Sequence, residues 1–397
     1  MRGSTAGLPD NLQGYSTKYY TLLTILDLLF ASLVVCPCVV GYWRAVWGLM
    51  DIYLAPFGDP YNGLISISIG MTGHLIFSIF QKVFERNFHP ERNRIIFYLV
   101  SRNYTVCFAF ICVNGWRGPW ECLDFLSKTD MFSLIATTLV GVVALVSIRG
   151  LRNITAPPFL IATDDVKGYF EVMTMFRIQV GDKTSLYVLD CLFSVLIVGS
   201  LVVFVWRGVW LMLDIILFPD NFTISSWGSL ILGYICVVFA FLLQPAMRYT
   251  CERLNGFSRL LVADTFILFA FFGTVNVWRG IWNLLNIFFL PDNMELSCWI
   301  THWVCLIILI LCRCSNSLLV RGVYIDAEEP AGKCVVFPCY YLRVIFRKKK
   351  LKKLNVASAS HNTIVRINHK DEKTVENHVH ISTITTTIEE NNIEERK

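Results

Sequence analysis

The chain has 397 residues, of which 55% are hydrophobic and only 16% are charged, and its formal net charge is +5. In ordinary soluble domains about a quarter of the residues are charged. A soluble protein of this size could not bury so much apolar surface. The composition therefore excludes a plain cytosolic enzyme, a disordered chain and a DNA-binding module. Because the apolar residues fall in blocks between charged connections, we expect an all-α membrane protein with several transmembrane helices.

Eight of these blocks resemble transmembrane helices, which need about 20 mostly apolar residues. The third is interrupted by Ser101-Arg102-Asn103, and the fourth and eighth are short enough to need flanking residues. The expected spans cover residues 20–40, 63–80, 95–113, 131–146, 186–205, 227–243, 257–277 and 298–311.

The connections between these spans differ in charge. Those after the second, fourth and sixth spans hold twelve basic residues, whereas the others hold only Lys128 outside the tryptophan motif described below. Cytoplasmic loops carry the excess of Lys and Arg, so we expect both termini in the cytoplasm. The first twenty residues lack an apolar core, so we expect no cleaved signal peptide. Asn221, in the sequon Asn221-Phe222-Thr223 of a predicted outer loop, is a glycosylation candidate.

A motif with the pattern W-R-x-x-W-x-x-x-[D/N] recurs four times, each time at the outer end of an odd-numbered span. Segments 205–221 and 277–293 match at 10 of 17 positions, including a closing Pro-Asp-Asn. Intervals of 73, 90 and 72 residues between the first tryptophans indicate two duplicated halves, each with two two-span units. The motif residues are Trp43, Arg44, Trp47 and Asp51; Trp116, Arg117, Trp120 and Asp124; Trp206, Arg207, Trp210 and Asp214; and Trp278, Arg279, Trp282 and Asn286.

Two interpretations of this motif stay open. Trp and Arg at a helix end are typical of interface anchors, with the indole at the headgroups and the Arg snorkelling. Alternatively, the Arg pairs with the acid. Within one helix the two are separated by about 10 Å of rise, so pairing requires a helix break at the glycine or an acid from a neighbouring unit. Contacts of the latter kind would lock four units around a pseudo-fourfold axis, although Asn286 leaves the last copy without an acid.

Ionisable residues also occur near the inner ends of the odd-numbered spans: Asp27, Arg102, Asp190 and Asp264. Charges inside membrane segments are functional candidates, unless they snorkel to the inner interface. A third possibility is that Arg102 pairs with one or more of these acids inside the bundle. For His74 and His302, in the second and eighth spans, a packed or hydrogen-bonded histidine is favoured over a proton relay.

The chain divides into a cytoplasmic N-terminal segment (1–19), a first four-helix half (20–148), a cytoplasmic inter-half loop (149–185), a second four-helix half (186–314) and a cytoplasmic tail (315–397). The inter-half loop could dock a partner or lie on the membrane. Residues 354–397 have the polar composition of a disordered tail. Palmitoylation candidates are Cys312, Cys314, Cys334 and Cys339. A basic patch that suits anionic lipid headgroups comprises Arg343, Arg347, Lys348, Lys349, Lys350, Lys352 and Lys353.

The sequence lacks the common phosphate-binding, nucleophile and zinc-binding motifs, an Arg-rich voltage-sensing helix and a carbonyl filter. We therefore expect no enzymatic activity, no cofactor, no metal site and no nucleic-acid partner.

The eight spans with Trp-Arg-Gly-x-Trp and Pro-Asp-Asn elements resemble the Fuseless family of invertebrate eight-pass membrane proteins. The resemblance covers residues 20–315 and rests on 206–210 and 278–282. Copies at 43–47, where Ala45 replaces glycine, and at 116–120, which lacks Pro-Asp-Asn, are weaker. The resemblance implies a presynaptic plasma-membrane protein that organises calcium channels, supports neurotransmitter release and binds channel or scaffold proteins.

The residues themselves leave a second function open, a secondary transporter or channel for a cation or small solute. Acidic outer loops would concentrate cations, and Asp27, Asp190 and Asp264 could line their path. A wet bundle axis lined by these aspartates would favour transport, whereas a dry axis packed with apolar side chains would favour a platform.

Overall fold

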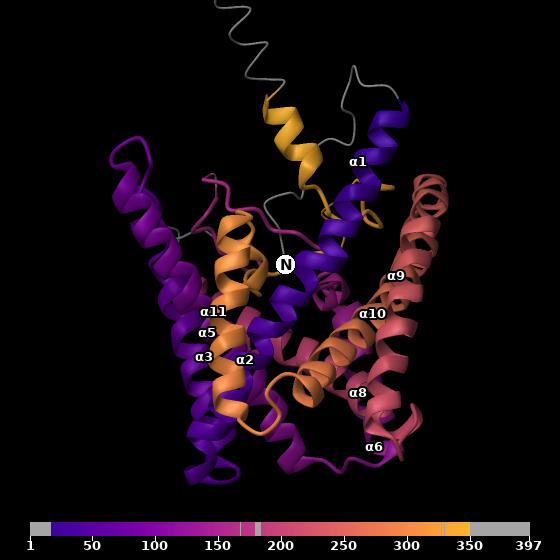
Figure 1. Cartoon of the computed structure of the whole chain (residues 1–397). Helices are drawn as coiled ribbons and strands as arrows, with labels where there is room; N and C mark the ends of the chain where they lie inside the picture. The colour runs from indigo at the N-terminus through magenta and orange to yellow at the C-terminus, as the bar shows by residue number, and fades with distance from the viewer. Residues whose placement is uncertain (1–16, 167, 179–183, 327, 329, 350–397) are drawn as a thin grey trace, which may run out of the picture. The chain divides into compact units, whose positions relative to one another are not determined.

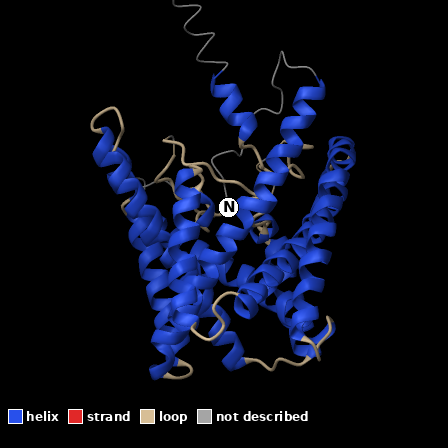
Figure 2. Ribbon diagram, in the orientation of Figure 1, coloured by secondary structure: helices blue, strands red, loops and turns tan. Residues whose placement is uncertain are grey.

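The computed structural model describes residues 17–349 except 167, 179–183, 327 and 329 (Figure 1). These residues form helices and loops, and the described part of the chain contains no strand (Figure 2). One compact unit ends at Tyr341, and the described residues of a second, 342–349, are helical. The predicted all-α class is therefore confirmed.

The helices of the compact unit follow the predicted blocks. In the first half, α1 (Thr17–Phe30), the π-helical η1 (Ala31–Val35) and α2 (Cys36–Leu54) form one continuous helix. They are followed by η2 (Ala55–Phe57), α3 (Tyr61–Ile79), α4 (Gln81–Asn87), α5 (Arg94–Leu126), α6 (Met131–Ser147) and η3 (Leu151–Ile154). In the second half, α7 (Thr184–Leu192), the π-helical η4 (Phe193–Gly199) and α8 (Ser200–Ile216) are likewise continuous. They are followed by α9 (Phe222–Arg253), α10 (Gly256–Phe288), α11 (Met294–Leu311) and η5 (Ser315–Leu318).

Seven helices in the described ranges are long and apolar enough to cross a membrane. They carry seven of the eight predicted spans. The fourth span corresponds to α6, which is apolar but has only 17 residues.

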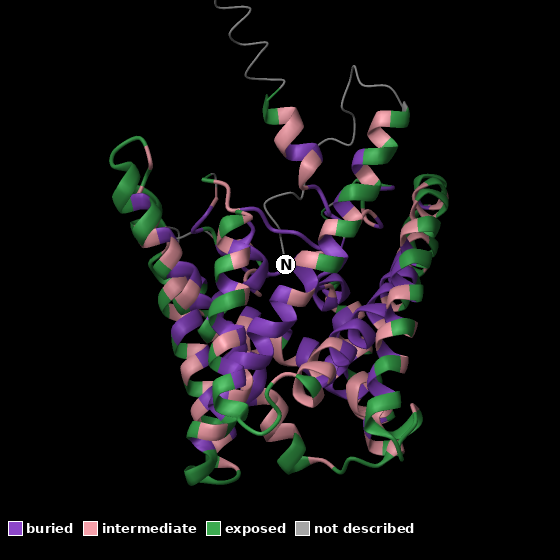
Figure 3. Cartoon of the chain, in the orientation of Figure 1, coloured by how far each residue is buried: buried purple, intermediate pink, exposed green. Residues whose placement is uncertain are grey.

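The helices that carry the tryptophan motif, α2, α5, α8 and α10, contact one another in a closed ring, in that order. Each packs most extensively on one outer helix: α11 on α2, α3 on α5, α6 on α8 and α9 on α10. Buried residues concentrate along the ring helices, and the outer helices expose much of their surface (Figure 3). The last helix of the bundle therefore packs on the first, which closes the structure.

In the last three copies of the motif, the glycine allows the outer helix to approach its ring helix closely. A Cβ on Gly118 would lie 2.5 Å from the amide nitrogen of Ile67, and one on Gly280 would lie 2.7 Å from that of Leu230. Neither α5 nor α10 breaks at its glycine. The glycine therefore serves packing, and the helix break considered above does not occur.

The Pro-Asp-Asn elements are turns that start the next helix. Phe218 and Leu290, just before them, have positive φ angles of 51° and 52°. Asn221 then accepts a hydrogen bond from the Ile224 amide (3.0 Å), and Asn293 accepts one from the Leu296 amide (3.0 Å). An N-cap of this kind satisfies a free amide at the first helical turn.

Two inner segments fold into the bundle. Leu151, Ile154, Phe159 and Ile161 of the inter-half loop are fully buried, as is Leu318 after the last helix. Most of the described part of 149–178 is therefore buried, although Val166, Glu171 and Phe176 are exposed. The compact unit extends to Tyr341, beyond the predicted boundary at 314. This burial could not be predicted from the sequence, because the segment mixes prolines, charges and apolar residues.

Candidate functional site

The four first tryptophans of the motif form a closed ring around the bundle axis, the inner tryptophan layer. Consecutive ring centroids lie 5.2–5.8 Å apart, and the planes cross at 70–81°. Such edge-to-face pairs are the favoured aromatic geometry. The members are Trp43, Trp116, Trp206 and Trp278, each at most 9% exposed.

The four second tryptophans form a parallel ring, the outer tryptophan layer. Their centroids lie 5.5–6.1 Å apart and their planes cross at 82–84°. These side chains are only partly buried. The members are Trp47, Trp120, Trp210 and Trp282.

Inner segments close the axis beneath the inner tryptophan layer. Trp43 Nε1 donates to the Leu318 carbonyl (3.1 Å), Trp206 Nε1 to the Ile154 carbonyl (3.1 Å) and Trp278 Nε1 to the Pro157 carbonyl (2.8 Å). The tryptophans therefore face the axis and each other. The predicted role as lipid-interface anchors does not describe this arrangement.

The arginines of the motif contact the acid of the preceding ring helix. Arg117 Nε donates to Asp51 (2.8 Å), Arg207 Nε to Asp124 (2.6 Å) and Arg279 Nε to Asp214 (2.7 Å). Arg44 Nε donates to the Asn286 amide oxygen (2.6 Å). The structure thus brings together all four pairs of the inter-unit interpretation. The four guanidinium side chains are among the largest fully buried groups in the described chain.

Serines on the outer helices accept hydrogen bonds from three of the four guanidinium groups. Arg117 donates to Ser66 on α3, Arg44 to Ser297 on α11, and Arg279 to Ser225 and Ser229 on α9. Arg207 differs, because Nη1 and Nη2 have no hydrogen-bond partner among the described residues. Thr138 on α6, beside Gly208, donates instead to the Leu134 carbonyl. Arg207 therefore depends on Asp124 alone.

The prediction that Arg102 pairs with Asp27, Asp190 or Asp264 is wrong. Arg102 donates to Asp164 and Ser315, which belong to the buried inner segments. Asp164 also accepts from the Asn316 amide (2.8 Å). A charge on the folded inter-half loop thus compensates Arg102, and sequence spacing along the helices could not reveal this partner.

Asp190 and Asp264 lie in different surroundings. Asp190 accepts hydrogen bonds from the Thr174 hydroxyl (2.6 Å) and from the Phe176 and Ile178 amides (2.9 and 3.1 Å). Asp264 instead lines a separate cavity of about 310 Å³ that also contacts Arg259 and Asp326. Asp27 is fully buried on α1.

Asp326 is a buried acid that sequence reasoning missed, because it lies beyond the last span. Its carboxylate accepts hydrogen bonds from the Leu151 and Arg152 amides (2.9 and 3.0 Å). Burial raises the pKa of Asp326 above its ordinary value, against the opposing effect of these amides. This contact ties the segment after α11 to the inter-half loop.

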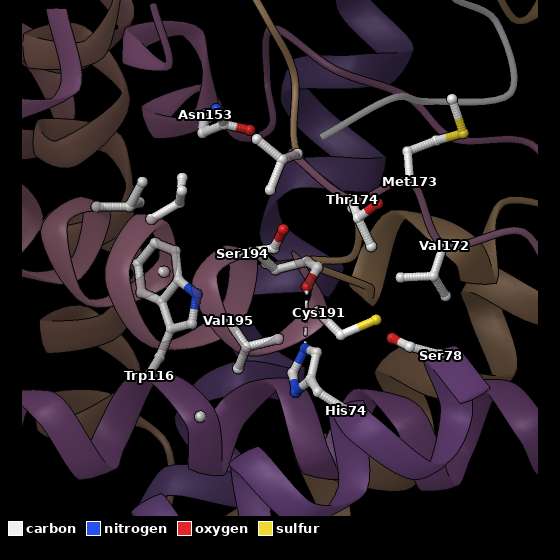
Figure 4. Close-up of a pocket in the computed structure, with 17 residues that line it drawn as sticks. His74, Ser78, Trp116, Asn153, Val172, Met173, Thr174, Cys191, Ser194 and Val195 are labelled. Atoms are coloured by element: carbon white, nitrogen blue, oxygen red, sulfur yellow. Dashed lines mark hydrogen bonds between the residues drawn. The ribbon is translucent and has the colours of Figure 1, made fainter. Parts of the chain in front are cut away.

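His74 is a packed histidine. Nδ1 lies 2.9 Å from the Gly70 carbonyl and Nε2 lies 3.5 Å from the Val320 carbonyl. It borders a small cavity of about 70 Å³, together with Trp116, Thr174 and Ser194 (Figure 4). His302 is also buried and packs against the ring of Tyr42. The two histidines lie on different helices, α3 and α11.

The remaining candidates are the glycosylation sequon, the four tail cysteines and the basic patch. Asn221 is exposed, and its side-chain oxygen caps α9. Cys314 and Cys339 are buried, whereas Cys312 and Cys334 are partly exposed. Four residues of the basic patch lie in the helical stretch 342–349: Arg343, Arg347, Lys348 and Lys349. The other three, Lys350, Lys352 and Lys353, lie outside the described residues, as does the predicted disordered tail, 354–397. No group of His, Cys, Asp and Glu in the described ranges is arranged to hold a metal ion.

The apolar helices and the ring of buried arginines define a multi-pass helical membrane protein. A family model for Fuseless matches residues 22–319, which is most of the chain, and the chain belongs to the Fuseless family. Neither the curated proteins nor the solved structures contain a match.

Proposed function

We propose that this protein is an eight-pass platform of the presynaptic plasma membrane that organises calcium channels and supports neurotransmitter release. Four two-helix repeats in two halves would form the platform, with both termini in the cytoplasm. This role is supported by membership of the Fuseless family, because resemblance to that family implies a presynaptic function. A platform needs no catalytic residue and no cofactor.

The 17 residues of α6 are compatible with an eighth crossing. At 1.5 Å per residue they rise about 25 Å, against a hydrocarbon thickness of ~30 Å. Local bilayer thinning and flanking residues accommodate a difference of this size. Eight crossings also return both termini to the side that carries the basic connections.

The closed bundle axis is the observation that carries the proposal. The inner tryptophan layer fills the axis, and three of its indoles bind carbonyls of the inner segments. Asp190, which a cation path would need, is instead saturated by three donors of the inter-half loop. An axis closed by tryptophans that are hydrogen-bonded to the inner segments suits a rigid scaffold better than a transport path.

The connection between α3 and α5 is a docking surface for such a partner. Lys82, Arg86 and Arg92 are exposed there, on the predicted cytoplasmic side. The inter-half loop is largely buried, so it offers less surface than its length suggested.

Copurification of calcium-channel subunits with the full-length protein from co-expressing cells tests this role. We expect the subunits to copurify, and the combined change Lys82→Glu, Arg86→Glu and Arg92→Glu to reduce their recovery. Lys128→Glu, an exposed change in a predicted outer connection, is the matched control. Equal recovery with both variants would contradict docking at this connection, and no recovery with the unchanged protein would contradict the organising role.

A further inference from the structure

The two tryptophan layers enclose a cavity of about 180 Å³, here called the tryptophan cup. Its lining consists of the eight motif tryptophans and one further residue, Glu121. The cavity volume is about six times the ~30 Å³ that one water molecule occupies in the liquid. The cup therefore has room for a small organic molecule.

The cup has a floor and a mouth. Its floor is the inner tryptophan layer, which is buried and bound from below by the inner segments. The outer tryptophan layer is only partly buried and forms the wall near the mouth. A molecule can therefore enter from the end of the bundle at which the motifs lie, but cannot continue along the axis.

The ring geometry favours a positive charge at the centre of the cup. The centroids of the outer tryptophan layer lie 5.5–6.1 Å apart around an approximate square. The centre of such a square lies about 4 Å from each corner, within the ~6 Å from a ring centroid at which a cation over the ring face is attracted. Tryptophan is the strongest partner in this interaction, and quaternary ammonium groups are bound in such cages.

The charged residues around the mouth of the cup also favour a cationic ligand. Glu121 is the one ionisable residue in the lining, and its carboxylate lies 4.0 Å from Arg117 Nη2. The paired acids Asp51, Asp124 and Asp214 have side chains 38–50% exposed, whereas their arginines are at most 1% exposed. The carboxylates therefore lie nearer the water than the buried guanidinium groups, and an approaching cation meets negative charge first.

From these observations we infer that the tryptophan cup binds a small organic ammonium ion, with the cationic head between the indoles and Glu121 as its counter-ion. This site is independent of the proposed platform role, because binding at a closed cup requires neither a transport path nor a channel partner.

Intrinsic fluorescence tests the inference directly, because eight of the eleven tryptophans line the cup. The full-length protein in detergent would be titrated with choline and, separately, with dimethylbutanol, its uncharged isostere in which carbon replaces nitrogen. We expect a saturable fluorescence change with choline and an at least tenfold weaker response to the isostere. Equal affinity for the two compounds, or no saturable change with choline, would overturn the inference.

Two variants locate the site without disturbing the tryptophan layers. Glu121→Gln removes the counter-ion with little change in shape, and we expect it to weaken choline binding about tenfold. Asp220→Asn removes an exposed acid that lies outside the cup, and we expect unchanged affinity. Near-ultraviolet circular dichroism checks that both variants keep the native tryptophan environment. Equal choline affinity of the two variants would contradict the assignment of Glu121.

Discussion

Arg44 near the start of the chain donates to the side-chain oxygen of Asn286, 242 residues later, at 2.6 Å. This contact joins α2 to α10 and so closes the ring of four motif helices. The other three members of the ring are Arg–Asp ion pairs. The closing contact thus places a buried cation beside a neutral partner.

Replacing Asn286 by Asp completes the fourth ion pair. A hydrogen bond to a charged group contributes roughly 1.5–3 kcal/mol, against roughly 0.5–1.5 kcal/mol for a neutral pair. We therefore expect Asn286→Asp to increase the free energy of unfolding by about 1 kcal/mol, measured by thermal unfolding in detergent. A lower melting temperature for this variant would show that Arg44 gains nothing from a negative partner.

Replacing the aspartate of an Arg–Asp pair should lower the free energy of unfolding by different amounts at different pairs. Arg207 has no partner other than Asp124 among the described residues, whereas Arg117 and Arg279 keep serine hydroxyls. Loss of one member of a buried ion pair costs about 3–5 kcal/mol. We expect Asp124→Ala to lie at the top of this range and Asp214→Ala below it in denaturation experiments. The reverse order would contradict the assigned contacts.

The motif glycines give a matched pair of packing variants. Gly280→Ala places a Cβ 2.7 Å from the Leu230 backbone, which cannot move without the whole of α9. Overpacking of this kind costs roughly 1–3 kcal/mol. Ala45 occupies the corresponding position in the first copy, and we expect Ala45→Gly to cost only about 1 kcal/mol, since glycine is a poor helix former. Equal melting temperatures for Gly280→Ala and the unchanged protein would refute the close approach of α9 and α10.

Asp326 predicts part of the pH dependence of stability. Its pKa is raised in the folded chain, chiefly by burial. The folded chain therefore holds this proton more tightly than the unfolded chain, and the resulting stabilisation is complete below the ordinary pKa of 3.8 and is lost as pH rises through the folded pKa.

Asp326→Asn should accordingly flatten the decline in melting temperature above pH 3.8. The exposed residue Asp292 provides the control, because Asp292→Asn should leave the profile unchanged. Identical pH profiles of melting temperature for Asp326→Asn and the unchanged protein would show that Asp326 does not contribute to the pH dependence of stability.

The sequence predicted the helices well because the apolar blocks are bounded by charges or turn residues, although the fourth and eighth blocks are short. The sequence also suggested that Arg117 pairs with an acid of another unit, because a continuous helix keeps Arg117 and Asp124 too far apart to pair. It did not show that Trp43 and its counterparts face the axis, since a tryptophan stripe has the same spacing at a lipid interface. The partner of Arg102, Asp164, was missed because only the tertiary fold brings the inter-half loop beneath the helices.

Flux through liposomes that contain the purified protein tests the closed axis most directly. Sodium, potassium, calcium and small organic anions would be followed separately, with protein-free liposomes as the baseline. The closed tryptophan layers predict flux at the baseline for every solute. Robust flux that Asp190→Asn abolishes would contradict the platform and establish a transport path through the bundle.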